Sequence, residues 1–105
     1  MPVYNKLVRD GIPELIASQG RTCRTRILDA QEYTCELRKK LAEETEEYLQ
    51  SESDPLALEE LADIMEVILA LAERHGGDEK VLESIRVNKA QARGRFKERI
   101  FLLET

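Results

Sequence analysis

The sequence has no tryptophan, a single histidine and two cysteines, and it lacks any long apolar run. A membrane-spanning helix needs about 18 or more consecutive apolar residues, so we expect no membrane partner. The chain starts with polar and charged residues rather than the apolar segment of a signal peptide, and we therefore expect a cytoplasmic protein. Cys23 and Cys35 have neither metal-ligand spacing nor a secretory context, which predicts reduced thiols. His75, just before Gly76, fits a helix end better than a metal site.

Positive charge is scarce in the centre of the chain. Residues 32–83 contain 16 acids and 5 bases, whereas the remaining residues contain 11 bases and 5 acids, and the net charge is −5. A nucleic-acid-binding domain is usually basic, so nucleic acid is not an expected partner. An acidic centre with basic ends fits a cation site that serves a small phosphorylated ligand. The alternative is that the bases merely balance the acids.

Hydrophobic periodicity predicts a mainly helical chain. The expected helices are Pro13–Gln19, Ala30 to about Gln50 capped by Asp29, Pro55 to about His75 capped by Asp54, and Glu79 to about Arg93 capped by Asp78. The connection between the two long helices is short, so they should be antiparallel neighbours. With 105 residues, 1–105 should form one domain with a modest core, and oligomerisation would bury more apolar surface.

Two other segments have the composition of strands. Arg21–Leu28 alternates roughly and is rich in β-branched residues, and Ile100–Leu103 is a candidate to pair with it. The expected fold is therefore all-α: a helical bundle of two long antiparallel helices plus a third helix, completed by oligomerisation. A short N-terminal helix and one small two-stranded β pairing would accompany the bundle.

Helical phase separates the acids of the two long helices into inward and outward sets. Glu60 falls in the middle of an apolar face and Asp63 at its edge. Glu44 lies on the apolar face of the earlier helix, and Glu47 lies next to that face. The outward acids are Glu43, Glu46, Glu59, Glu66 and Glu73.

An ionised carboxylate inside a protein must be protonated, paired or bound to a cation. The hard cation Mg²⁺ takes carboxylate oxygens and keeps waters for substrate phosphates. The alternative is an acid-rich helical surface, which fits the outward acids well and Glu60 poorly; for Glu44 and Glu47 the residues leave both readings open.

The spacing Glu44-x-x-Glu47 followed by Glu60-x-x-Asp63 resembles the metal-binding signature of the all-α nucleotide pyrophosphohydrolases. This superfamily includes MazG-like proteins, dimeric dUTPases and phosphoribosyl-ATP pyrophosphohydrolase. The flanking segments carry the resemblance further, to a small MazG-like branch: Tyr4-Asn-Lys-Leu-Val-Arg-Asp10 with Ile12-Pro-Glu14, and Lys89-x-x-x-Arg93-Gly-x-Phe96 with Ile100-x-Leu102. Gly11 and Arg95 depart from that pattern, where a lysine and a second glycine are expected, and both departures bear on nucleotide preference.

The resemblance implies a Mg²⁺-dependent hydrolase, with Mn²⁺ as an alternative cofactor. The reaction would attack the α-phosphorus of a nucleoside triphosphate and release a monophosphate and pyrophosphate. Glu44, Glu47, Glu60 and Asp63 would be metal ligands. One of these four acids, or the neighbouring Glu43, would instead orient the attacking water, and Glu43 and Glu44 are the candidate catalytic residues. The candidate phosphate-binding residues are Lys6, Arg9, Lys89 and Arg93, and the expected assembly is a homodimer or homotetramer. The alternative function is a non-catalytic helical dimerisation or regulatory module, which would leave Glu60 in solvent. A di-iron carboxylate bundle is not expected, because it would require Glu-x-x-His pairs and neither acid pair contains a histidine.

Overall fold

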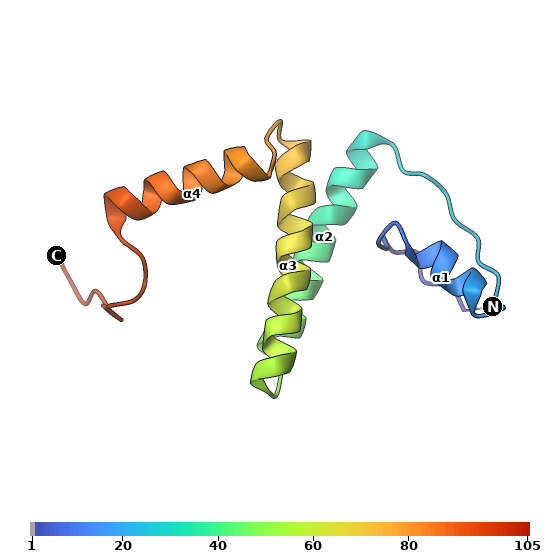
Figure 1. The fold of residues 1–105 in the computed structure, drawn as a ribbon, viewed down its shortest axis with the longest axis horizontal. Coiled ribbons are helices and arrows are strands. Elements are labelled where there is room, and N and C mark those ends of the chain that lie inside the picture. Colours follow the sequence, from blue (N-terminus) through green and yellow to red (C-terminus); the bar gives the residue numbers. More distant parts are fainter. Residues whose placement is uncertain (1) are drawn as a thin grey trace. The chain divides into compact units, whose positions relative to one another are not determined.

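The computed structural model describes residues 2–105, which form four helices and no strand (Figure 1). The helices are α1 (Ile12–Ser18), α2 (Ala30–Leu49), α3 (Asp54–Arg74) and α4 (Glu79–Arg93). The prediction of an all-α chain is therefore confirmed. Contacts divide the chain into a first unit that ends at Leu71 and a second unit, Ala72–Thr105. The assignment of 1–105 to one domain stays a prediction, and no helix in the described part combines the length and apolar character needed to cross a membrane.

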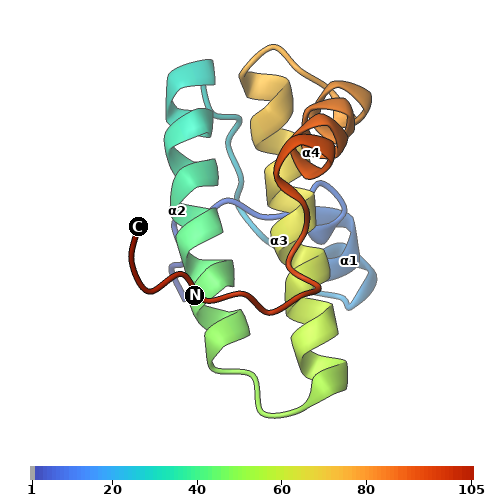
Figure 2. The same cartoon turned by 90° about the vertical axis from the view of Figure 1, so that its left-hand side faces the viewer.

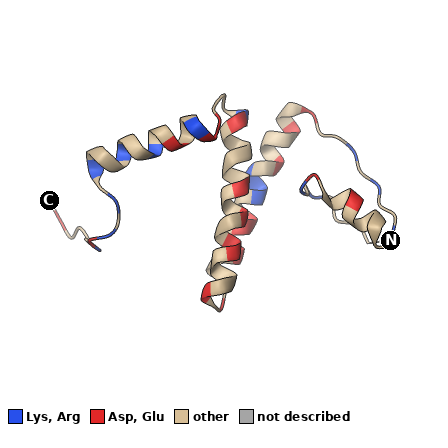
Figure 3. Cartoon of the chain, viewed as in Figure 1, with Lys and Arg blue, Asp and Glu red and all other residues tan. Residues whose placement is uncertain are grey.

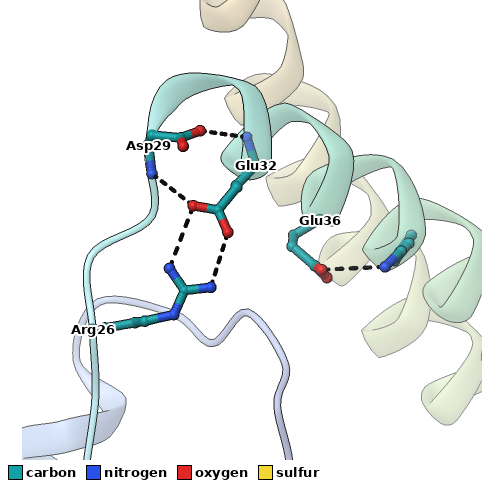
Figure 4. Close-up of polar contacts among 5 residues, drawn as sticks. Arg26, Asp29, Glu32 and Glu36 are labelled. Atoms are coloured by element: carbon teal, nitrogen blue, oxygen red, sulfur yellow. Dashed lines mark hydrogen bonds and ion pairs between the residues drawn. The ribbon is translucent and has the colours of Figure 1, made fainter.

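The start of α2 has the local structure that its sequence predicts. The Asp29 carboxylate accepts a hydrogen bond from the backbone N–H of Glu32 at 2.8 Å, and the Glu32 side chain accepts one from the backbone of Asp29. This reciprocal capping box satisfies two donors that the first turn of a helix leaves without helical partners. Arg26 adds an ion pair to Glu32 at 2.9 Å, so the segment before α2 is fixed to its first turn (Figure 4).

The starts of α3 and α4 also depend on polar caps. The Ser53 hydroxyl accepts a hydrogen bond from the backbone N–H of Leu56, which makes Ser53 the N-cap of α3, one residue earlier than the predicted Asp54. Asp78 caps α4, as predicted, by accepting from Val81 at 2.9 Å. Gly94 then ends α4 at φ +82°, a backbone conformation that costs glycine little.

In the first unit, α2 and α3 lie side by side and run in opposite directions (Figure 2). The short segment between Leu49 and Asp54 favours this antiparallel return. Leu37 on α2 and Val67 on α3 are the buried apolar side chains of the described chain, with exposed fractions of 4% and 8%. The antiparallel pairing therefore places the acids near the connected ends of both helices at similar heights.

The predicted strands are absent from the described residues. Neither 21–28 nor 100–103 has strand structure, and the proposed two-stranded pairing was wrong. Strand-forming composition describes side chains that fit a pleated, half-buried surface. Ile27 is 93% exposed, and Ile100 and Phe101 are each 85% exposed, so these side chains have no such surface to pack against. Within 21–29, Arg26 instead forms a local ion pair with Glu32 in the first turn of α2.

Candidate functional site

Three glutamates from the two long helices meet in the first unit. Glu44 and Glu47 lie on α2 and Glu60 lies on α3, and one carboxylate oxygen of each lies within 4.8 Å of the others. Figure 3 shows the wider setting, with acidic residues distributed along both helices. The spacing of three residues puts Glu44 and Glu47 on the same side of α2. The antiparallel return then brings Glu60 to them.

Two of these carboxylates each bury one oxygen that has no hydrogen-bond partner. Glu44 is only 9% exposed, and Glu60 is half-buried. The Oε2 atoms of both residues have almost no solvent contact and no hydrogen bond within the described part of the protein. Leaving a buried acceptor unsatisfied costs free energy, and more when the group is charged. The two buried oxygens of Glu44 and Glu60 therefore favour the binding of a proton or a cation between α2 and α3.

Burial and mutual repulsion raise the pKa values of Glu44 and Glu60. Desolvation is the largest cause for each, because it disfavours the ionised form. The adjacent carboxyl group of Glu47 and the negative charge of Asp63 raise both pKa values further. Both carboxyl groups therefore hold a proton more readily than an isolated glutamate does.

Lys40 also belongs to the site, although no role was predicted for it from the sequence. Its Nζ lies 4.0 Å from Oε1 of Glu44, and its side chain is mostly buried. Its positive charge lowers the pKa of Glu44 and opposes part of the effect of burial. The signal was present in the sequence, because Lys40 and Glu44 are four residues apart and therefore neighbours on one helix face.

Asp63, the fourth predicted ligand, forms an ion pair with Arg9. The Arg9 Nη2 atom donates to Oδ1 of Asp63 at 2.6 Å, and both side chains are substantially exposed. Asp63 is close enough for its charge to act on both Glu44 and Glu60. The three-oxygen cluster nevertheless consists of the glutamates alone. Two residues predicted for different roles, a metal ligand and a phosphate-binding group, thus pair with each other.

The remaining predicted residues lie outside this cluster. Glu43 faces solvent on α2, and Lys6 is exposed with its Nζ 5.5 Å from the centre of the Tyr4 ring. Lys89 and Arg93 lie on α4 in the second unit. Their roles as a catalytic residue (Glu43) and as phosphate-binding residues (Lys6, Lys89 and Arg93) stay predictions.

The chemistry of the donors suits a hard divalent cation. Glu44, Glu47 and Glu60 offer only carboxylate oxygens, which Mg²⁺, Ca²⁺ and Mn²⁺ accept and which zinc and copper sites usually supplement with nitrogen or sulfur. A cation bound there would neutralise the repulsion and satisfy the buried oxygens of Glu44 and Glu60. The residues present therefore fit such an ion, and the donor set does not choose between Mg²⁺ and Mn²⁺.

Comparison with protein-family models gave no match, and no curated protein or solved structure matched the chain.

Proposed function

We propose that this protein is a divalent-cation-dependent nucleotide pyrophosphohydrolase related to the MazG-like proteins. Its substrate would be a nucleoside triphosphate or a related phosphoanhydride, cleaved between the α- and β-phosphates to give a monophosphate and pyrophosphate. Such an activity would suit the removal of unwanted nucleotides from the cellular pool. The observation that carries the proposal is the pair of buried, unpartnered oxygens of Glu44 and Glu60 beside Glu47.

This arrangement of carboxylates costs free energy. Three carboxylates with oxygens within 4.8 Å repel one another, and two of them lose solvation as well. A protein that needed only a stable helix pair would be better served by apolar residues at these positions. A cation-binding role explains why acids occupy them. The Glu44-x-x-Glu47 and Glu60-x-x-Asp63 pattern then favours the pyrophosphohydrolase class over other cation-dependent functions.

In the proposed reaction, Glu44, Glu47 and Glu60 would hold the cation, and Asp63 of α3 would be a further ligand once released from its ion pair with Arg9. A divalent cation at this position supplies charge neutralisation for phosphate oxygens and acidifies water. The protein's own residues then have few covalent tasks, because phosphoryl transfer depends mainly on position and charge. Glu44 or Glu43 would orient the attacking water. Lys6 and Arg9 of the N-terminal segment would bind phosphates of the substrate, and the same role for Lys89 and Arg93 of α4 stays a prediction from the sequence.

The direct test is a panel of common and modified nucleotides incubated with Mg²⁺ or Mn²⁺. We expect pyrophosphate, rather than orthophosphate, as the first inorganic product from at least one nucleotide. Glu60→Gln should reduce the rate steeply, whereas the matched Glu59→Gln change on the outer face should have little effect. Orthophosphate as the only early product would move the cleavage to another bond and contradict the proposal.

A second candidate is a non-catalytic dimerisation or regulatory module, favoured by apolar side chains on the surface. Leu58, Leu61, Met65 and Ile68 recur at spacings of three and four along α3 and are all exposed. A second copy of the chain would be a natural partner for this stripe, and dimerisation is compatible with the enzyme as well. A protein that associates but cleaves no nucleotide and binds no Mg²⁺ would fit the module rather than the enzyme.

A further inference from the structure

One ion pair connects the N-terminal segment to α3, the helix that carries Glu60 and Asp63. Arg9 and Asp63 lie 54 positions apart in the sequence, yet Nη2 of Arg9 is 2.6 Å from Oδ1 of Asp63. By contrast, the ion pairs Lys39–Glu36 and Lys40–Glu44 remain within α2. The Arg9–Asp63 contact therefore attaches the segment before α1 to α3. It does so beside the three glutamates.

Asp63 is placed to serve the same site as the glutamates. It follows Glu60 by three residues and so lies on the same side of α3. Its negative charge acts on the carboxyl groups of both Glu44 and Glu60. The Arg9 guanidinium, however, makes a short, charge-assisted hydrogen bond to it. Arg9 thus holds one oxygen of the carboxylate that would otherwise complete an all-oxygen ligand set.

We propose that Arg9 and a divalent cation compete for Asp63. In the cation-free protein Arg9 holds Asp63; when a cation enters between the glutamates, Asp63 turns to it and Arg9 is released. This inference rests on the proposed cation site. An exposed arginine suits the role, because guanidinium groups bind carboxylates and phosphates through the same fork of N–H donors. The released Arg9 can then bind an anionic phosphate group of the substrate.

This competition has a thermodynamic consequence. Any ligand that binds Arg9 away from Asp63 must strengthen cation binding, and the cation must strengthen binding of that ligand to the same extent. Because Arg9 and Asp63 are 57% and 39% exposed, the ion pair is weak and can exchange readily. Arg9 would therefore tune the cation site rather than block it.

The test is a double-mutant cycle on Mg²⁺ affinity, measured by titration calorimetry without nucleotide. Arg9→Gln removes the competitor, so the dissociation constant for Mg²⁺ should fall by about two- to fivefold, the range expected for an exposed ion pair. Asp63→Asn should weaken Mg²⁺ binding. In the Asp63→Asn background, Arg9→Gln should change the affinity little, because the contested carboxylate is gone.

Arg21→Gln is the matched control for the loss of one positive charge. Arg21 is exposed and its guanidinium bonds the side-chain oxygen of Gln19 instead of an acid. It should leave Mg²⁺ affinity close to that of the wild type, with circular dichroism verifying that each variant folds. An unchanged affinity in Arg9→Gln, or an equal gain with and without Asp63, would overturn the competition while leaving the cation site intact. A wild-type protein that binds no Mg²⁺ would overturn both.

Discussion

Glu44 and Glu60 combine burial with like charge, and this combination gives the acidic cluster its chemical character. Helical phase predicted their inward position, and the structure confirms it: Glu44 is buried and Glu60 half-buried, whereas Glu43 and Glu59 face solvent. Phase alone could not reveal that each inward residue leaves an oxygen without a partner. Nor could it reveal that Lys40 partly balances Glu44 while Arg9 engages Asp63, because those contacts depend on side-chain conformation.

The raised pKa values of Glu44 and Glu60 predict how the stability of the cation-free protein depends on pH. A carboxyl group with a raised pKa binds its proton more tightly when folded than when unfolded. Its contribution to stability therefore falls as the pH rises from the ordinary value of 4.5 through the raised folded value. Denaturant unfolding with a chelator should show a smaller decline for Glu60→Gln than for the wild type. Identical pH profiles would show that Glu60 does not carry this cost, and Glu59→Gln should retain the wild-type profile.

The helix starts are the features that local sequence specifies most completely. Asp29 and Asp78 were predicted as caps and both accept the expected backbone hydrogen bonds. Ser53 replaced Asp54 as the cap of α3, a difference of one residue that arises because both residue types are good caps. The capping box of Asp29 and Glu32 is the best connected of these starts, since Arg26 contributes to it as well (Figure 4).

Removing the cap of α2 should destabilise the protein measurably. We expect Asp29→Ala to lower the free energy of unfolding by about 1 kcal/mol at neutral pH, because the backbone donor of Glu32 loses its partner. Denaturant titration would measure the change. The neighbouring Gln31→Ala, on an exposed position of the first turn, is the control and should stay within about 0.5 kcal/mol of the wild type. Equal stabilities for wild type and Asp29→Ala would contradict the capping role.

Glu32 adds a pH dependence of the opposite sign to that of the acidic cluster. Hydrogen bonding to Arg26 and to the Asp29 backbone lowers its pKa from 4.5 to about 2. Its stabilising contribution is therefore complete above 4.5 and is lost as the pH falls through about 2. The difference in free energy of unfolding between wild type and Glu32→Gln should therefore shrink as the pH falls from 4.5 to about 2. Unfolding curves followed by helix content would measure it. Since Glu32 is exposed, the effect should be small and sensitive to salt. A stability difference between the two proteins that stays constant down to pH 2 would argue against the ion pair.

Across the whole chain, sequence patterns predicted the features set by local rules and missed those set by distant contacts. The four helices follow from periodicity and caps, and each predicted bound lies within one residue of the observed bound. The prediction of two strands was wrong because a composition rich in strand-forming residues does not supply a neighbouring strand to pair with. The convergence of Glu44, Glu47 and Glu60 could be anticipated because a short connection leaves α3 no other direction than back along α2. The Arg9–Asp63 contact could not be anticipated, because irregular backbone segments lie between the two residues and their sequence does not determine where Arg9 lies relative to α3.

The exposed apolar side chains lead to a prediction about assembly. Leu58 and Met65 are 67% and 61% exposed on one stripe of α3 and would gain from being covered. We expect light scattering at micromolar concentration to give at least the mass of a dimer. The double change Leu58→Glu and Met65→Glu should shift the population toward monomer, while Glu59→Gln should not. A wild-type protein that remains monomeric would contradict this prediction.

The central claim is that Glu44, Glu47 and Glu60 bind a divalent cation, and thermal unfolding with and without Mg²⁺ tests it most directly. Mg²⁺ at a hundredfold excess over its dissociation constant should stabilise the wild type by about 2.7 kcal/mol, because the ion binds the folded state. Mg²⁺ should stabilise Glu60→Gln much less. In chelator this variant should be at least as stable as the wild type, because one of the mutually repelling charges is gone. Glu59→Gln should respond to Mg²⁺ like the wild type. Equal Mg²⁺ responses in Glu60→Gln and Glu59→Gln would contradict a cation site between these helices.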